Sequence, residues 1–430
     1  MMNRKDAACY ALEQLKKAGA DDAAVLVSGG KLDELNIDGG EFSLMRSGFK
    51  TGLSLKAIKE QRTGRISTNS CEREAIDRAV ADCMAAALAA QPDEAESIAP
   101  KGENGHFTDG VLTPDRDRLF DRLQEYMDTL KAEYPKVMME QLIAKYDHDD
   151  ILLMNTNGVE MRYENGAYVF STMFSAHEGE KAGSFNGTYH LTKNLDRPVM
   201  ELDMMRRLLQ DAEADLTAAP VPEKFEGTLL VTPAFMGEFL GTALSCYAGD
   251  SALIGGTSIW RDKLGQQVAS AGITLETRPL DERIVCGERF DVDGFRSENG
   301  VILQDGVLKS FCLSNFAARK TGLTRAANQS GAYFLHPGEK SLEELIAGIE
   351  NGILINRFSG GAPGPSGDFN GVAKNSFRIR NGRLAGAVTE TMISGNFSHL
   401  LQNLRGISRE TACDGMTVLP WAAFDGVTVK

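Results

Sequence analysis

The sequence predicts an α+β protein, with an N-terminal helix and antiparallel-sheet domain, a middle α/β segment and a larger, mainly β C-terminal domain. Three observations lead to this prediction. Stretches with helical apolar spacing alternate with short, glycine-punctuated runs that have strand character. Two polar stretches that contain proline, 91–105 and 218–227, divide the chain. Most of the 44 glycines lie after residue 236, where many turns and strands are therefore expected.

The first domain is expected over residues 1–96. Apolar residues repeat at helical spacing within 4–18, and Gly19 ends that run. The short alternating stretches AAVLVSGG, LDELNIDGG and FSLMRSGFKTGLSLKAI suit a small antiparallel sheet. The alanine-rich stretch from Arg73 to Ala90 predicts a second helix, so the unit is read as helix, sheet, helix.

The middle segment is expected over residues 106–217. Thr113 is a suitable N-cap and Pro114 suits a first turn, which predicts a helix over 114–132. The segments ILLMNTNG and AYVFSTMFSAHEG have strand character, and a further helix is expected near 199–217.

The C-terminal domain is expected over residues 223–430. The segment GTLLVTP leads into a helix that begins after Thr232, and the remainder is predicted to be mainly β, with one helix near 341–350. A glycine- and proline-rich loop covers 359–371; loops of this length often serve function, although a flexible surface connection explains it equally well.

Composition excludes several classes of partner. The chain carries 60 acidic and 46 basic residues, for a net charge of −14, so a direct nucleic-acid partner is not expected. The N-terminus is a polar amphipathic pattern and not a signal peptide, and no apolar run approaches the ~18 residues of a membrane span, so no membrane partner is expected. Seven scattered cysteines without CxxC spacing predict reduced thiols and a cytoplasmic location.

Local sequence provides no complete catalytic motif. His177 and Glu178 begin like HExxH, but Lys181 and Ala182 follow where the second histidine would stand. A zinc site needs three or four spaced His, Cys, Asp or Glu ligands, and none of the six histidines has such neighbours along the chain. GxSxG and Walker A motifs are also absent from the sequence.

Glu238 and Cys413 are weaker candidates for a functional role. Glu238 and Thr242 fall at the edge of the apolar face of the helix after Thr232. A carboxylate there would serve as a general base only beside a metal, and alone it is read as a solvated or salt-bridged residue. Cys413 precedes Asp414 and would need a histidine base to act as a nucleophile, so an inert thiol is favoured.

Five segments, in order along the chain, carry a family resemblance. The most specific is GDFNGVAKNSFRIRNGRLAGAVTETMISGNFSHLLQNL at 367–404, and GADDAAVLVSGGKLDELNIDGGEF near the N-terminus also fits. Between them lie SIWRDKLGQQVASAGITLETRPL (258–280), GFRSENGVILQDGVLKSFCLSNFAARKTG (294–322) and SLEELIAGIENGILINRFSGG (341–361). These segments resemble the TldD/PmbA family, also known as modulators of DNA gyrase and related to peptidases, and the resemblance covers nearly the whole chain.

The resemblance also implies what this chain lacks. In the TldD branch a helix carries an HExxxH zinc motif, and a cysteine near the C-terminus is the third ligand. Gly237 and Thr242 stand at the two histidine positions here, Glu238 is retained, and Cys413 lies in the region of the third ligand among residues that match poorly. No catalytic residue, bound metal or other cofactor is therefore expected in this chain, and zinc is expected in a TldD-like partner.

The function implied is that of a non-catalytic PmbA/TldE-like subunit, which pairs with a TldD-like chain in a metallopeptidase that degrades or processes unfolded peptides. Two alternatives stay open. One is an autonomous peptidase that uses Cys413 or distant carboxylates, and the other is a homodimeric protein that binds extended peptides without turnover. A direct DNA modulator is disfavoured by the acidic charge balance.

Overall fold

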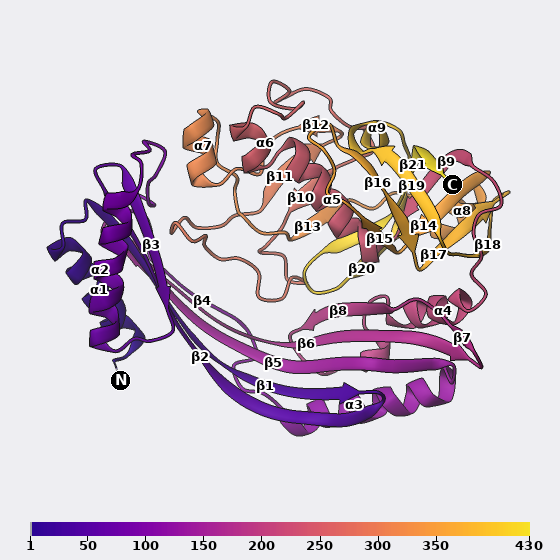
Figure 1. Ribbon diagram of the computed structural model, residues 1–430, viewed down its shortest axis with the longest axis horizontal. Helices are drawn as coiled ribbons and strands as arrows, with labels where there is room; N and C mark the ends of the chain where they lie inside the picture. Colours follow the sequence, from indigo (N-terminus) through magenta and orange to yellow (C-terminus); the bar gives the residue numbers. More distant parts are fainter. Residues whose placement is uncertain (1) are drawn as a thin grey trace.

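The structure is a computed structural model that describes residues 2–430 and confirms the α+β class. In Figure 1 the long strands of one sheet curve beneath the C-terminal half of the chain, which forms a second sheet with its own helices. The first sheet has the order β3-β2-β1-β5-β6-β4, and β7 and β8 also pair with β6. The strands predicted for 1–96 and for 106–217 therefore join in one sheet.

The strands of the first sheet include the longest in the described chain. They are β1 (Asp22–Asp38), β2 (Glu41–Lys59), β3 (Arg62–Thr68), β4 (Gly105–Gly110), β5 (Val137–Asn155), β6 (Glu160–Glu178), β7 (Lys181–Ala182) and β8 (Asn186–Thr192). All their pairings are antiparallel except β4 with β6.

The second sheet follows the order β12-β11-β10-β13-β21-β9-β14-β17-β18, and β15, β16, β19 and β20 extend it from the side. Its strands are β9 (Phe225–Val231), β10 (Leu275–Thr277), β11 (Gly300–Gln304), β12 (Val307–Leu308), β13 (Tyr333–Leu335), β14 (Asn351–Ile355), β15 (Arg357–Gly360), β16 (Asp368–Lys374), β17 (Ser376–Arg380), β18 (Arg383–Val388), β19 (Thr391–Asn396), β20 (Leu404–Cys413) and β21 (Val418–Val429).

The helices are α1 (Arg4–Lys17), α2 (Arg73–Ala89), α3 (Arg116–Glu133), the 3₁₀ turn η1 (Val199–Glu201), α4 (Met205–Asp215), α5 (Pro233–Tyr247), α6 (Asp250–Ile254), α7 (Asn315–Thr321), α8 (Leu342–Ala347) and α9 (Phe397–Gln402). The longer ones lie close to their predicted positions, although α3 is capped by Asp115 and not by Thr113. The short helices α6, α7 and α9 were not predicted, because segments of five to seven residues are too short for apolar spacing to reveal. The region near 199–217 is two pieces and not one helix. Asp203 interrupts it with a φ of +42°, which is incompatible with an α-helical turn.

Three apolar cores position these elements. Helices α1 and α2 pack on β1–β3 through small and aliphatic side chains, including Ala11, Val25 and Cys83. Helices α3 and α4 cover the other end of the sheet, and that core continues into the second sheet through Leu230, Leu354 and Trp421. The third core lies around α5 in the C-terminal half. Because the second core contains side chains of both sheets, it joins the two halves of the molecule.

The glycine-punctuated stretches predicted as short strands are continuous instead, because β1 runs through Gly29 and Gly30 without a turn. A Cβ at Gly30 would stand 1.9 Å from the carbonyl oxygen of His148 on the neighbouring strand β5. Glycine at this position thus allows close approach of two backbones and does not mark a turn.

The stretch 91–105, predicted as a linker, is irregular but packed against both halves. Ala95 and Ala99 are buried, and their carbonyl groups accept hydrogen bonds from Arg319 (3.1 Å) and Asn155 (2.9 Å). Neighbouring side chains thus provide the hydrogen bonds that an irregular segment cannot obtain from a helix or a sheet. Among the helices of residues 2–430, none combines the length and apolar character that a bilayer crossing requires.

Candidate functional site

A cavity of about 620 Å³ opens beside the first turns of α5. Its walls come from both sheets and from loops that lie far apart in the sequence. The lining residues are Leu191 on β8; Pro233, Ala234, Gly237 and Glu238 on α5; Ile284, Val285, Cys286, Gly287 and Glu288; Ser330, Gly331, Ala332 and Tyr333; and Asp414, Met416 and Thr417.

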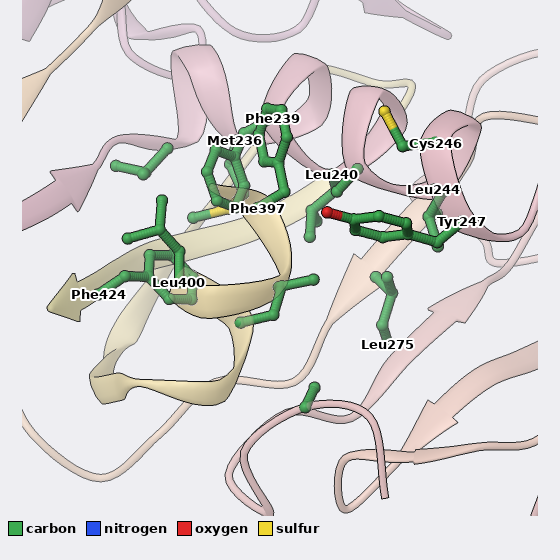
Figure 2. Packing of buried hydrophobic residues seen from close by; sticks show 14 of the residues in the cluster. Met236, Phe239, Leu240, Leu244, Cys246, Tyr247, Leu275, Phe397, Leu400 and Phe424 are labelled. Atoms are coloured by element: carbon green, nitrogen blue, oxygen red, sulfur yellow. The ribbon is translucent and has the colours of Figure 1, made fainter. Parts of the chain in front are cut away.

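Helix α5 begins where the sequence predicts it. Thr232 occupies the N-cap position in extended conformation and Pro233 follows at the first turn, where a missing N–H costs nothing. The face that carries Met236, Phe239 and Leu240 is almost fully buried and packs on Phe397, Leu400 and Phe424 (Figure 2). Packing on this side fixes the rotation of the helix, so the opposite side is presented to the cavity.

Two of the predicted positions, Gly237 and Glu238, line the cavity. A Cβ at Gly237 would lie 3.7 Å from Leu419 and 4.0 Å from Thr417, which is ordinary van der Waals contact, so the wall has room for a side chain. Glu238 is exposed to the cavity, and within residues 2–430 no hydrogen bond or salt bridge holds its carboxylate. Partial burial raises the pKa of Glu238, and the positive charge of Arg357 opposes that rise.

Thr242 lies outside the residues that line the cavity. It follows Gly237 by five positions, which places it about 140° further around a regular helix. Gly241, four positions after Gly237, falls on the same side as Gly237. A Cβ at Gly241 would approach the ring of Tyr333, a cavity residue, at 3.6 Å. The helix therefore brings Gly237 and Glu238 into the cavity but not Thr242.

The turn between β20 and β21 closes the cavity. The Asp414 carboxylate accepts hydrogen bonds from the N–H groups of Met416 (2.8 Å) and Thr417 (2.7 Å). The Leu191 N–H donates to the Asp414 carbonyl at 2.8 Å, and the Val285 N–H donates to the Gly415 carbonyl at 2.7 Å. This turn thus ties β8 of the first sheet to a loop of the second.

Cys413 precedes that turn but does not line the cavity. Its sulfur lies 3.8 Å from the Arg283 carbonyl oxygen, and burial raises the pKa of the thiol. A nucleophilic cysteine requires a thiolate, which a neighbouring base or cation favours and burial opposes. Its surroundings therefore keep Cys413 in the unreactive protonated form at neutral pH.

Sequence reasoning did not select several residues that form the walls. Cys286 has a φ of +54°, and burial, followed by the charge of Asp109, raises the pKa of its thiol to about 12. Burial likewise raises the pKa of Tyr333 to about 12. Both groups are neutral at physiological pH. The only hint in the sequence at the position of Cys286 is the following Gly287, because glycine favours a turn. This hint does not show that the turn borders a cavity.

A second, smaller cavity of about 230 Å³ shares Pro233, Asp414 and Thr417 with the first and is also lined by Asp203. The Asp203 side chain reaches solvent through this cavity, and protein surrounds it on its other sides. Burial, followed by the negative charge of Asp414, raises the pKa of Asp203 to about 6. The ionisation of Asp203 therefore changes the charge of this region near pH 6.

Comparison with known sequences and structures identifies the relationship of the chain. Residues 225–430 match the profile of the "PmbA/TldA metallopeptidase C-terminal domain", and residues 23–87 match that of "PmbA/TldA metallopeptidase domain 1". The chain belongs to the TldD/PmbA family. A curated relative, metalloprotease PmbA of Escherichia coli O157:H7, is 24% identical over 423 residues, 93% of this chain and 90% of that protein.

Solved structures share the fold along the whole chain. A structure described as a modulator of DNA gyrase from Bacteroides thetaiotaomicron superposes with a TM-score of 0.86 at 23% identity and covers 100% of both chains. TldE from Thermococcus kodakarensis superposes with a TM-score of 0.82 at 20% identity and covers 98% of this chain and 99% of that one. At these identities the likeness concerns the fold.

A metallopeptidase family implies a metal, and zinc requires particular donor groups. The part of α5 that faces the cavity offers one carboxylate and no imidazole. Over residues 2–430, no three His, Cys, Asp or Glu side chains are grouped so that they could hold a metal ion. Zinc takes three or four such ligands. The side chains present at this site therefore do not fit zinc.

Proposed function

We propose that this chain is the PmbA/TldE-like, non-catalytic subunit of a cytoplasmic metallopeptidase complex, in which a TldD-like partner holds the zinc. The observation that carries the proposal is the cavity beside α5, which retains Glu238 but has glycine at position 237. A lone carboxylate has no Lewis acid beside it to lower the pKa of water. The chemistry is therefore assigned to the partner chain.

The role of this chain is to shape a chamber for extended, unfolded peptides. About half of the residues that line the cavity have small side chains, among them Gly287, Ser330 and Gly331. Exposed main-chain groups recognise an extended peptide through its backbone and so with little sequence preference. The neutral Cys286 and Tyr333 leave the wall without a reactive group of their own.

A cytoplasmic location is supported by the state of the thiols. All seven cysteines are free within the described residues, and several, including Cys71 and Cys83, are buried as small apolar side chains. Chains that function in oxidising compartments usually pair such residues.

The proposal is tested with the purified chain, a TldD-like chain from the same organism and an equimolar mixture. Zinc content and hydrolysis of an unstructured fluorogenic peptide are measured with and without a chelator. We expect no stoichiometric zinc and no turnover for this chain alone, and chelator-sensitive turnover in the mixture. Replacing Glu238 with Gln in this chain should leave turnover in the mixture within about twofold, because the carboxylate contacts no metal.

Other outcomes identify the alternatives. Stoichiometric zinc in the isolated chain contradicts the proposal. Chelator-resistant turnover by the isolated chain that Cys413→Ala abolishes identifies an autonomous cysteine-dependent peptidase. Peptide binding by the isolated chain, without turnover and without any effect of the partner on it, identifies a peptide-binding protein.

A further inference from the structure

A separate cavity of about 650 Å³ lies where the start of α1 meets β4, β5 and β6, at the end of the first sheet that α1 covers (Figure 1). It shares no lining residue with the cavity beside α5. Its volume is typical of sites that bind small molecules. Five of its lining residues are charged: Arg4, Lys5, Asp150, Glu160 and Arg162.

The charge of this cavity has the opposite sign to that of the whole chain. Three cationic and two anionic side chains line it, which leaves one positive charge in excess when the lining His106 is neutral. The whole chain has a net charge of −14. A local excess of positive charge inside a concavity attracts anions.

The buried Asp150 fixes two guanidinium groups in this cavity. Arg162 donates from Nε to Oδ1 (2.9 Å) and from Nη2 to Oδ2 (2.8 Å) of Asp150. This bidentate pair alone matches the charge of Asp150. Arg4 donates to the same Oδ2 from Nη1, at 2.7 Å, so its positive charge is additional. Asp150 is only 3% exposed, so an entering anion meets the guanidinium groups and not this carboxylate.

A glycine allows Arg4 to lie close to the sheet. Gly29 pairs with Asp150 across β1 and β5, and a Cβ at Gly29 would lie 2.7 Å from Nε of Arg4. The guanidinium group therefore lies directly against the backbone of β1. Within residues 2–430, Nε and Nη2 of Arg4 and Nη1 of Arg162 donate no hydrogen bond. Because a guanidinium group has five donors, these N–H groups remain available to a ligand.

Lys5 adds a third positive charge. Its Nζ is 2.8 Å from Oε1 of Glu160, and the two side chains are 62% and 35% exposed. An exposed ion pair of this kind stabilises a protein very little, so Lys5 can exchange its partner for a ligand at small cost. The cavity thus combines two fixed guanidinium groups with one movable ammonium group.

We propose that this cavity binds a phosphate group, either as inorganic phosphate or as part of a small phosphorylated molecule. The free N–H groups of Arg4 and Arg162 donate to the phosphate oxygens, and Lys5 contributes a point charge. Phosphate matches three cations better than a carboxylate does, because it has close to two negative charges and at least three acceptor oxygens. The proposal concerns a site distinct from the α5 cavity and does not rest on the proposed function.

The cavity is larger than inorganic phosphate requires. Four oxygen atoms occupy roughly the space of four water molecules, about 120 Å³. The remaining volume is bordered by the apolar Leu152 and by the ring of His106. Sites for small molecules combine apolar walls with a few fixed polar groups. An organic group attached to the phosphate therefore has room beside it.

Calorimetric titration of the full chain in a phosphate-free buffer tests binding directly. The probes are inorganic phosphate, adenosine 5′-monophosphate and, at the same ionic strength, sodium acetate. We expect saturable binding of a phosphate at one site per chain and none of acetate. Binding of the nucleotide about tenfold tighter or more assigns an organic phosphate, and any smaller difference assigns inorganic phosphate. No saturation by either phosphate at about 10 mM, or equal binding of acetate, overturns the proposal.

A substitution that should improve binding locates the site. Glu160→Gln releases Lys5 and removes a negative charge from the cavity, so phosphate should bind about threefold tighter or more. Glu13→Gln is the matched control, because Glu13 also pairs with a lysine of α1, Lys17 at 2.6 Å, but at the other end of the helix. A misfolded variant cannot show this gain. Equal affinities of the two variants overturn the assignment of the site.

Removal of a guanidinium group should weaken binding. Arg4→Gln should lower the affinity for phosphate about tenfold or more, while Asp150 keeps its bidentate pair with Arg162 and the fold is retained. Lys17→Gln removes the same charge from the same helix outside the cavity and should have little effect. Circular dichroism confirms that each variant is folded. Equal affinities of the two folded variants overturn the proposal.

A glycine substitution provides the same test without a change of charge. Gly29→Ala should also weaken binding of phosphate, because the added methyl group displaces the guanidinium group of Arg4. Gly48→Ala is the matched control, since Gly48 lies on β2 and a Cβ there has no atom within 4 Å. A loss in Gly29→Ala no larger than in Gly48→Ala overturns the role of Arg4.

Discussion

The two faces of α5 differ in how tightly their residues are packed. On one face Phe239 is 1% exposed; it lies edge-on to Phe397 and stacks on Phe424, with centroid distances of 5.1 and 5.2 Å. On the other face Gly237 and Glu238 open into a cavity where nothing presses on them. The buried face fixes the position of the helix in the fold, while the cavity face is free to change its chemistry without affecting folding.

This contrast explains how a metallopeptidase fold accommodates a site that does not fit zinc. The packing that positions α5 is independent of any metal ligand, because no residue of its buried face reaches the cavity. A chain can thus retain the architecture and the cavity while the side chains that would hold zinc are missing.

The largest expected effect is on the buried face. Phe239→Ala should lower the free energy of unfolding by roughly 3–5 kcal/mol, since it removes an aromatic side chain from a close-packed core. Glu238→Ala, its neighbour on the cavity face, should change stability by no more than about 0.5 kcal/mol. Urea denaturation followed by circular dichroism measures both. Comparable losses for the two variants would remove the contrast between the faces.

We expect the cavity wall opposite α5 to be as rigid as the core. Gly415 has a φ of +83°, and a Cβ there would lie 2.2 Å from the Leu191 carbonyl oxygen. Gly415→Ala should therefore cost roughly 2–4 kcal/mol, from the clash and the backbone strain together. Gly265→Ala is the matched control, because it has a similar φ of +77° and no atom within 4 Å of a Cβ. Equal decreases in melting temperature for the two variants would show that the cavity wall adjusts to the added side chain.

Metal ligands can be introduced on the cavity face of α5 by substitution. Gly237→His with Gly241→His places two imidazoles four residues apart on one side of the helix, a spacing that holds zinc. This variant should gain about 1.4 kcal/mol of stability at a zinc concentration tenfold above its Kd. Gly237→His alone is the control and should gain none, because one imidazole beside one carboxylate provides too few ligands for zinc. Calorimetric titration with zinc measures both variants, and equal affinities would show that the second imidazole does not share the ion.

The smallest effect concerns the carboxylates behind the cavity. Asp203 has a folded-state pKa of about 6, above its ordinary value of 3.8, so the stability tied to its proton is present below about pH 4 and lost as the pH rises through 6. Asp203→Asn should therefore stabilise the protein above pH 6 by roughly 1 kcal/mol, after allowance for solvent screening, and have no effect at pH 4.

Thermal unfolding at pH 4 and pH 7.5 tests this expectation. The exposed Asp121→Asn on α3 is the control for a general change of net charge. A pH-independent effect of Asp203→Asn would exclude this carboxylate as the titrating group.

The sequence predicted the longer helices and the α+β class, because both depend on local pattern, but it did not predict the short helices α6, α7 and α9. The apolar spacing after Thr232 was sufficient to place α5 and to identify which face is buried. The sequence could not predict that β1 and β2 are continuous, since glycine within a strand and glycine in a turn look alike until the neighbouring backbone is known.

By itself, the sequence determined that this chain has no histidine at position 237, 241 or 242, and that α5 has one apolar face. Only the tertiary structure decided which residues surround Glu238. Cys286, Tyr333 and Asp414 reach the cavity from segments about 50 to 180 residues further along the chain than Glu238. Their positions are set by the pairing of β13 and β21 and by the hydrogen bonds of the turn at Gly415. The physical reason is that local pattern fixes the rotation of a helix, whereas a cavity is formed by distant segments that sheet pairing brings together.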